Sequence, residues 1–376
     1  MPTKLERDIE NQLALIHDLA TKAETWSSRP GWIEFSTNNV CNLRCVMCAQ
    51  ADGLPLMVMA PEEARRFLEQ ALPSACNVTP SAISEPFLGN MDLMVELCRK
   101  HEVFLTIYTN GTVLDGRRFR AMADRIAKLY ISFDSHVPEV FERIRVRAKF
   151  DVVVRHIREI LPAAAELGVP MGFVFVMMAE NTPHLPEYVD FLADLGASQA
   201  RAQIRVQRLL YDVTAAKERG YDVEDRYSRE EICGFLDLAA ERARARGVAL
   251  HVDAAEPFAR SVHPVPPVQR GIGAELLEFV SEAVRRRYPA FCSMAAYYMK
   301  VEPDGTVYPC CRQPRELRMG NVREKSVEEI WNGPEYREFR RRMFAGEYPP
   351  SCRGCDVLVD NPAFRALRNG NGGKAV

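Results

Sequence analysis

The chain has 376 residues, of which 47% are hydrophobic and 27% charged, a composition typical of a globular protein in water. This length allows one large domain and a smaller one. The formal net charge of −2 argues against nucleic acid or an anionic membrane as a partner. No apolar run approaches the roughly 20 residues that span a bilayer. The charged N-terminus does not resemble a secretory signal, so we expect a cytoplasmic protein.

Residues 1–30 are expected to form an N-terminal amphipathic helix that packs on the outside of the main domain. Apolar residues recur at helical spacing between residues 4 and 26, and Ser27 to Gly31 end the pattern. A partner-binding role is the lesser alternative. The recurring residues are Leu5, Ile9, Leu13, Ile16 and Leu19.

From residue 31 to 253, predicted strands and helices alternate, which is typical of a parallel α/β sheet or barrel. The expected strands are 32–37, one ending near Ile83, 103–108, 128–134, 171–178, 202–209 and 248–252. The expected helices are 61–72, 91–100, 150–167, 185–195 and 229–246. Six or seven strand–helix units result, and chemistry in such units lies at the carboxyl ends of the strands.

The remaining chain divides into three parts. Residues 254–291 are expected to be a linker with a helix at 274–287, and residues 292–360 a small second domain. In that domain a β-hairpin should turn at Pro303 to Gly305, and a helical stretch should cover 327–345. Residues 361–376 are expected to be a flexible tail.

The distribution of the eleven cysteines indicates metal binding or catalysis rather than a disulfide framework. Three fall in Cys41-Asn-Leu-Arg-Cys45-Val-Met-Cys48, and five lie between residues 292 and 355. The scattered Cys76, Cys98 and Cys233 are expected to be buried small hydrophobic residues, with hydrogen-atom donation to a substrate radical as a lesser alternative.

The C-x3-C-x2-C loop can place three sulfurs around one face of an iron–sulfur cubane and leave the fourth iron open. A zinc knuckle would need a fourth ligand nearby, and the sequence between Pro30 and Gln70 offers none. The loop resembles that of the radical S-adenosylmethionine (SAM) superfamily. The resemblance implies a partial (β/α)6 barrel in which Cys41, Cys45 and Cys48 hold a [4Fe–4S] cluster whose open iron binds SAM. Reduction then splits SAM to a 5′-deoxyadenosyl radical.

The same resemblance implies further contacts to SAM at the strand ends. Ser84-Glu85-Pro86 occupies the place of the family's Gly-Gly-Glu-Pro motif, with Ile83-Ser84 in place of the two glycines. Ser132 and Asp134 resemble the Ser-x-Asp-Gly segment, with Ser135 in place of glycine.

An arginine that often contacts the SAM carboxylate in the family corresponds to Arg145, with Arg143 as a close rival. Asn110, in a turn where Gly111 should take a positive φ, is expected to touch SAM. Asn181 and Gln207 are weaker candidates for adenosine or substrate contacts.

The C-terminal cysteines follow a C-x12-G-x4-C…C-x2-C pattern that resembles the SPASM/twitch group of this superfamily. That resemblance implies an auxiliary [4Fe–4S] cluster on Cys292, Cys310, Cys352 and Cys355. With only Cys311 to spare, the single-cluster twitch form is expected. Whether Cys311 rather than Cys310 is the ligand stays open, and a zinc ribbon is the alternative structural reading.

These resemblances imply a radical SAM oxidoreductase that abstracts a hydrogen atom from a substrate held between the barrel mouth and the auxiliary domain. We expect oxidation or epimerisation of a small molecule such as an aminosugar, because the segment before Trp32 is too short for a leader-binding domain. Modification of a ribosomal peptide is the first alternative, and a non-catalytic iron–sulfur electron carrier the second. An external one-electron reductant of the flavodoxin or ferredoxin type is the expected partner.

Overall fold

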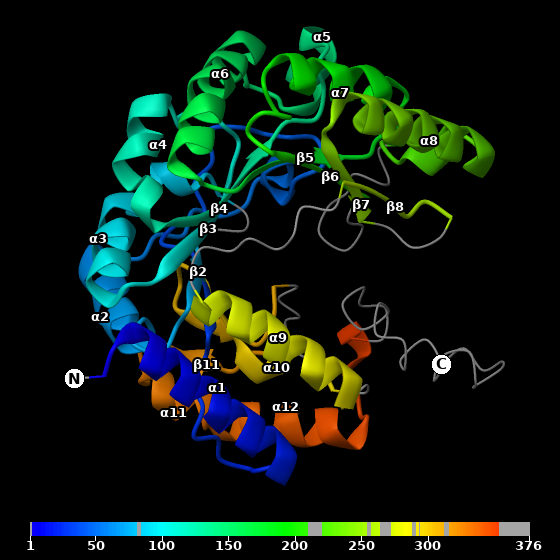
Figure 1. Ribbon diagram of the computed structural model, residues 1–376. Coiled ribbons are helices and arrows are strands. Elements are labelled where there is room, and N and C mark those ends of the chain that lie inside the picture. The colour runs from blue at the N-terminus through cyan, green and yellow to red at the C-terminus, as the bar shows by residue number, and fades with distance from the viewer. Residues whose placement is uncertain are drawn as a thin grey trace, which may run out of the picture.

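A computed structural model describes most of the chain, and its strands and helices are arranged as in Figure 1. The described residues are 2–80, 84–209, 220–253, 257–263, 272–287, 291–292, 294–311 and 316–352. Within these ranges no helix is both long enough and apolar enough to cross a membrane.

A curved sheet organises the molecule. Its first seven strands lie in chain order and run parallel, each paired with the next. This arrangement confirms the expected α/β barrel of six or seven units. The strands are β1 (Trp32–Phe35), β2 (Asn77–Thr79), β3 (Phe104–Thr109), β4 (Ile126–Ser132), β5 (Met171–Val176), β6 (Gln203–Gln207) and β7 (Ala249–Asp253).

Helices follow the strands and lie along the outside of the curved sheet (Figure 1). Several begin with proline in the first turn, as α2 does at Pro61, because proline's missing N–H is not needed there. The helices are α2 (Pro61–Ala71), α3 (Met91–His101), α4 (Gly116–Met122), α5 (Pro138–Ile144), α6 (Phe150–Leu167), α7 (Leu185–Asp194) and α8 (Arg229–Arg246). Short 3₁₀ turns include η1 (Ala49–Asp52), η2 (Pro86–Leu88), η3 (Ala123–Arg125), η4 (Thr182–His184) and η6 (Val223–Asp225).

The two faces of the sheet differ in chemistry because successive side chains of a strand point to opposite faces. The outer face is apolar and packs on the helices: Phe35 of β1 meets Phe67 of α2, with ring centroids 4.8 Å apart. The inner face, away from the helices, carries polar and aromatic residues at alternate positions. Its members include Glu34, Thr79, Thr106, Tyr108, Lys128, Tyr130, Gln203, Arg205, His251 and Asp253.

The C-terminal hairpin continues the same sheet instead of forming a separate layer. Strand β9 (Tyr298–Val301) pairs in parallel with β1, and β10 (Thr306–Tyr308) pairs antiparallel with β9. Strand β11 (Gly320–Asn321) follows beyond β10, and β8 (Arg260–Val262) pairs antiparallel with β7 at the other edge. The hairpin was expected from the sequence, but its junction with β1 was not.

The helices that follow β8 agree with the sequence prediction except in the region of residues 327–345. Helix α9 (Ile272–Arg287) lies beside α1 (Lys4–Thr21), and α10 (Met294–Tyr297) precedes β9. The single helical stretch expected over 327–345 is two helices, α11 (Val327–Trp331) and α12 (Pro334–Ala345), followed by the short turn η7 (Pro350–Cys352). The break falls at Gly333 and Pro334, because glycine disfavours helix and proline can only begin one.

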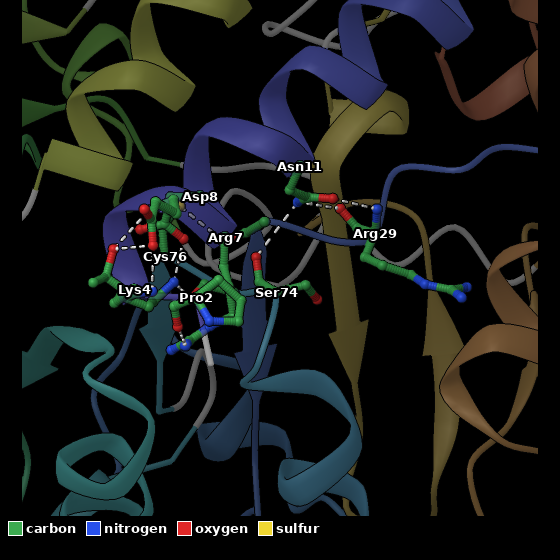
Figure 2. A network of polar contacts seen from close by, with 12 residues as sticks. Pro2, Lys4, Arg7, Asp8, Asn11, Arg29, Ser74 and Cys76 are labelled. Atoms are coloured by element: carbon green, nitrogen blue, oxygen red, sulfur yellow. Dashed lines mark hydrogen bonds and ion pairs between the residues drawn. The ribbon is translucent and has the colours of Figure 1, made fainter.

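Helix α1 packs through a mixed face that differs in part from the one that the apolar spacing suggests. Leu15 and Leu19 are buried together with Asp8, Gln12 and Asp18, whereas Leu13 is 60% exposed and Leu5, Ile9 and Ile16 are also exposed. Figure 2 shows the contacts responsible. Lys4 pairs with Asp8 and donates to the Ala75 carbonyl at 2.8 Å. With these polar contacts in place, four of the five predicted apolar residues stay exposed and only Leu19 is buried.

Asn11 completes this anchoring of α1 (Figure 2). Its amide donates to the carbonyls of Arg29 and Ser74 at 3.1 and 3.4 Å, and its oxygen accepts from the Arg29 N–H at 2.7 Å. These bonds satisfy backbone groups of two loops, which an apolar side chain could not do.

A buried ion pair fastens the junction between β1 and β9. Lys300 donates to Glu34 at 2.5 Å and lies 3.3 Å from Glu302, and Tyr298 also donates to Glu34. Burial lowers the pKa of Lys300, but the neighbouring carboxylates of Glu34 and Glu302 outweigh burial and leave the pKa above its usual value. Lys300 is therefore charged, and the carboxylate of Glu34 depends on it for compensation.

Replacing Lys300 by Met should destabilise the protein by about 3–5 kcal/mol, because it leaves the Glu34 carboxylate buried without its cation. The double variant Glu34→Gln/Lys300→Met should recover part of this loss, since glutamine is neutral and still accepts from Tyr298, although Glu302 also loses its contact with Lys300. Urea midpoints followed by circular dichroism measure both.

Lys149→Met is the matched control, because Lys149 pairs with Glu142 at an exposed site and its loss should leave the midpoint unchanged. Equal midpoints for Lys300→Met and Lys149→Met would show that the buried pair does not hold the junction.

Candidate active site

The first three cysteines lie in the loop that follows β1. Cys45 is buried and Cys41 and Cys48 are half-buried. The loop is fixed on both sides of Cys45: the Arg44 N–H donates to the Val146 carbonyl and the Val46 N–H to the Ile144 carbonyl, each at 3.0 Å. The cysteine loop is therefore fastened to the end of α5.

Hydrogen-bond donors surround two of these sulfurs. Cys41 Sγ accepts from the Leu43 N–H at 3.4 Å and from Asn110 Nδ2 at 3.8 Å, and Cys45 Sγ accepts from Arg145 Nη1 at 3.7 Å. Burial raises the pKa of Cys41 and raises that of Cys45 to about 12. Bare thiols here would stay protonated, so a bound metal is what would convert them to thiolates, with these donors in support.

The donor set suits an iron–sulfur cluster. Cysteine thiolates are the usual ligands of [4Fe–4S] clusters, and each of the three can bind a different iron of one cubane.

Glu85, expected to contact SAM, is held by the chain itself. Its carboxylate is buried and accepts from Thr109 Oγ1 at 2.7 Å, from the Asn110 N–H at 2.8 Å and from the Phe87 N–H at 3.4 Å. Burial raises the pKa of Glu85 and these donors oppose the rise. The side chain ties the segment after β2 to the turn after β3.

The structure describes only some of the residues around Glu85 in the segment that was compared with the Gly-Gly-Glu-Pro motif. Ser84 is half-buried, Pro86 is buried and opens η2, and Ile83 lies outside the described residues. The Glu85 N–H donates to the Val40 carbonyl at 3.0 Å, which places the motif directly beside the cysteine loop.

The turn after β3 closes around the cysteine loop as well. Asn110 donates to Asn42 at 3.0 Å and accepts from Thr112 Oγ1 at 2.6 Å. Asn42 in turn donates to Thr112 at 2.8 Å. The sequence reasoning missed Asn42, although its position inside the C-x3-C spacing could have signalled it.

Gly111 has a φ of +75°, as expected. A Cβ at Gly111 would lie 3.1 Å from Ile131 and 3.2 Å from Val153, so both backbone and packing require glycine.

Asp134 and Arg145 come together in the interior. Arg145 Nε lies 2.6 Å from Asp134 Oδ2, and Asp134 Oδ1 accepts from the Val176 N–H at 2.8 Å. Burial raises the pKa of Asp134 although Arg145 opposes it. The rival Arg143 is exposed and pairs with Glu180 at 3.2 Å. Ser132, at the end of β4, is half-buried.

Asn181 is buried and hydrogen-bonded to backbone groups, whereas Gln207 is partly accessible at the end of β6. The buried Asn181 amide donates to the carbonyls of Asp134 and Val176, each at 2.9 Å, and its oxygen accepts from the Met178 N–H. These bonds use up the groups that an adenosine contact would need. Gln207, the last residue of β6, is half-buried.

The inner face of the sheet offers a partly open polar surface. Tyr108 and Tyr130 stack with ring centroids 4.7 Å apart, and a Cβ at Gly172 would approach Tyr130 to 2.8 Å, so glycine makes room for the ring. On the next strands Arg205 and Asp253 form an ion pair at 2.5 Å, with about a third of each side chain exposed. None of these residues was expected from the sequence.

The C-terminal cysteines lie toward the opposite end of the strands from the first cysteine loop. Cys292 precedes β9 and Cys310 follows β10, so both lie toward the end at which β1 begins. The first cysteine loop leaves the end at which β1 finishes. Burial, with the nearby thiols of Cys292 and Cys352 adding to it, raises the pKa of Tyr348 to about 12. Cys311 is exposed. Cys355 lies outside the described residues.

Two family models match the chain. The radical SAM superfamily model matches residues 35–192, and a model described as an iron–sulfur cluster-binding domain, SPASM, matches residues 292–356. A PqqA peptide cyclase from Gluconobacter oxydans is 25% identical over 329 residues, which cover 84% of this chain and 80% of the relative. A GTP 3′,8-cyclase from Petrotoga mobilis is 26% identical over 172 residues, covering 43% of this chain and 52% of that one.

Solved structures share the fold at low sequence identity. Streptococcus suis SuiB bound to S-adenosylmethionine superposes with a TM-score of 0.60 at 15% identity, covering 90% of this chain and 73% of SuiB. The protein anSMEcpe with bound AdoMet gives 0.58 at 17% identity, covering 87% and 84%. The two family models imply iron–sulfur clusters and SAM as cofactors. This chain belongs to the radical SAM superfamily and carries a C-terminal SPASM iron–sulfur domain.

Proposed function

We propose that this radical SAM enzyme modifies a ribosomally made peptide. The observation that carries the proposal is the similarity to a PqqA peptide cyclase, which extends over both domains and covers most of each chain. SuiB, which shares the fold, has also been solved with its precursor peptide SuiA. These relatives favour the peptide alternative over the small molecule that the sequence alone suggested.

In this proposal Cys41, Cys45 and Cys48 hold the SAM-binding cluster, and Cys292, Cys310, Cys352 and Cys355 hold one auxiliary cluster. When bound, the first cluster supplies the electron that splits SAM and so generates the radical that removes a hydrogen atom, and the auxiliary cluster supplies an acceptor for a second electron. The chain supplies the surrounding donors and the buried frame that orients them.

Of the residues expected to contact SAM, Ser84 and Ser132 are half-buried. Glu85 and Asn110 have their polar groups hydrogen-bonded within the chain, and Asp134 accepts a hydrogen bond through Oδ1 and pairs with Arg145 through Oδ2, so these residues chiefly shape the surroundings of the cysteine loop. The substrate lies on the inner face of the sheet. The two cysteine sets lie toward opposite ends of β1. Because β1 has four residues at about 3.3 Å each, these two ends are about 13 Å apart.

Iron and sulfide content tests the proposed ligands. Anaerobically reconstituted protein should hold about eight irons, and the triple variant Cys41/Cys45/Cys48→Ala about four, because one [4Fe–4S] cluster is lost. Cys98→Ala is the matched control: Cys98 is fully buried, and its removal should leave the iron content unchanged. About four irons and one zinc in the wild type would instead mean a structural C-terminal zinc site.

Peptide modification is tested by mass spectrometry. The protein should be co-expressed with each short peptide encoded beside its gene, and one peptide should become lighter by two hydrogen atoms. The reason is that one hydrogen atom is abstracted, and a further electron and proton must leave to restore paired electrons. The triple cysteine variant should leave that peptide unchanged.

The competing functions are distinguished by the small-molecule products and by the masses of the peptides. Formation of 5′-deoxyadenosine and a changed aminosugar, with every peptide unchanged, would identify a small-molecule enzyme. No 5′-deoxyadenosine under strong reductant, with both clusters intact, would identify an electron carrier.

A further inference from the structure

Arg145 stands where α5 meets the cysteine loop. It directly follows Ile144, the last residue of α5, and its own N–H closes the helix on the Phe141 carbonyl at 2.8 Å. Backbone bonds from Arg44 and Val46 reach the residues on either side of it. The arginine is therefore held beside Cys45 by main-chain pairing, whatever its side chain does.

The Arg145 side chain has two buried partners. Its Nη1 lies 3.7 Å from Cys45 Sγ, and its Nε lies 2.6 Å from Asp134 Oδ2. Asp134 is itself fixed by the Val176 N–H at 2.8 Å. The guanidinium is planar and rigid, so these two contacts fix its orientation. Only 6% of the residue is exposed.

Such a cation changes how readily a cluster accepts an electron. A reduced cluster carries one more negative charge, and an N–H donor with a positive charge beside a ligand sulfur stabilises that charge. The effect is large where water is excluded, because the effective dielectric constant is low. Hydrogen bonds to ligand sulfurs are among the features that set cluster potentials.

We propose that Arg145 acts through Cys45 rather than through SAM: it orients that ligand and raises the reduction potential of the first cluster, while Asp134 holds the guanidinium in place. The inference rests on the proposed ligation of that cluster by Cys41, Cys45 and Cys48. Arg145 is accordingly a positioning residue.

The test is a redox titration of the reconstituted protein, followed by electron paramagnetic resonance. The first cluster is identified as the one whose signal changes on adding SAM, because its open iron can bind SAM and a fully ligated cluster cannot. In Arg145→Gln, the ratio of reduced to oxidised first cluster at a fixed potential should fall about tenfold, which is a shift of about 59 mV to more negative potential. SAM affinity should stay near the wild-type value.

Three further variants give the shift a sign, a control and an intermediate value. Asp134→Asn keeps the cation and removes its counter-charge, so the potential should move in the opposite direction, to more positive values. Arg143→Gln removes an exposed arginine two residues away and should leave the potential unchanged. Arg145→Lys keeps the charge but cannot reach both partners, so its potential should lie between those of the wild type and Arg145→Gln.

The outcomes separate this inference from the proposed function. An unmoved potential in Arg145→Gln, together with weakened SAM binding, would make Arg145 a SAM ligand and overturn the inference alone. If Arg145→Gln fails to assemble the cluster, the opposite shift in Asp134→Asn decides the matter, and its absence overturns the inference. Unchanged iron content in the triple cysteine variant would overturn both.

Discussion

The structure depends on the pairing of β1 with β9. Strand β1 carries the chain into the first cysteine loop, and β9 and β10 carry it between Cys292 and Cys310. Because the two strands share one sheet, the spacing of the two cysteine sets is set by a hydrogen-bonded ladder rather than by the linker between domains. Glu34 and Lys300 place a buried ion pair at this junction, where loss of Lys300 leaves the Glu34 carboxylate without its cation.

Buried polar side chains that contact one another hold the cysteine loop of the candidate active site in place. Glu85 joins the segment after β2 to the turn after β3, and Asp134 with Arg145 joins the end of β4 to the cysteine loop. These groups are buried, where a charge is costly unless it is paired. The loop is thereby held in shape by three neighbouring segments. On the inner face of the sheet the stacked Tyr130 is buried, and the Arg205–Asp253 pair is partly exposed.

Much of the fold could be predicted because local signals agree with the tertiary structure. Helices α6 and α8 have the predicted bounds, since their apolar faces are regular and Gly168 and Gly247 end them in the left-handed conformation. The orientation of α1 could not be predicted. Its hydrophobic pattern indicates one face, but Asp8 and Asn11 bind across to backbone groups of distant segments, and such contacts leave no periodic signal.

The sequence by itself determined the chemistry: cysteine spacing is a local property, so the C-x3-C-x2-C loop and the later cysteines identified the superfamily and its SPASM domain. Tertiary structure decided how those parts meet. Pairing of β9 with β1 joins residues more than 260 positions apart in the chain, and only the folded sheet shows that Arg145 faces Cys45 while Arg143 faces solvent. The physical reason is that side-chain direction at a helix end depends on what packs against it, which spacing along the chain does not encode.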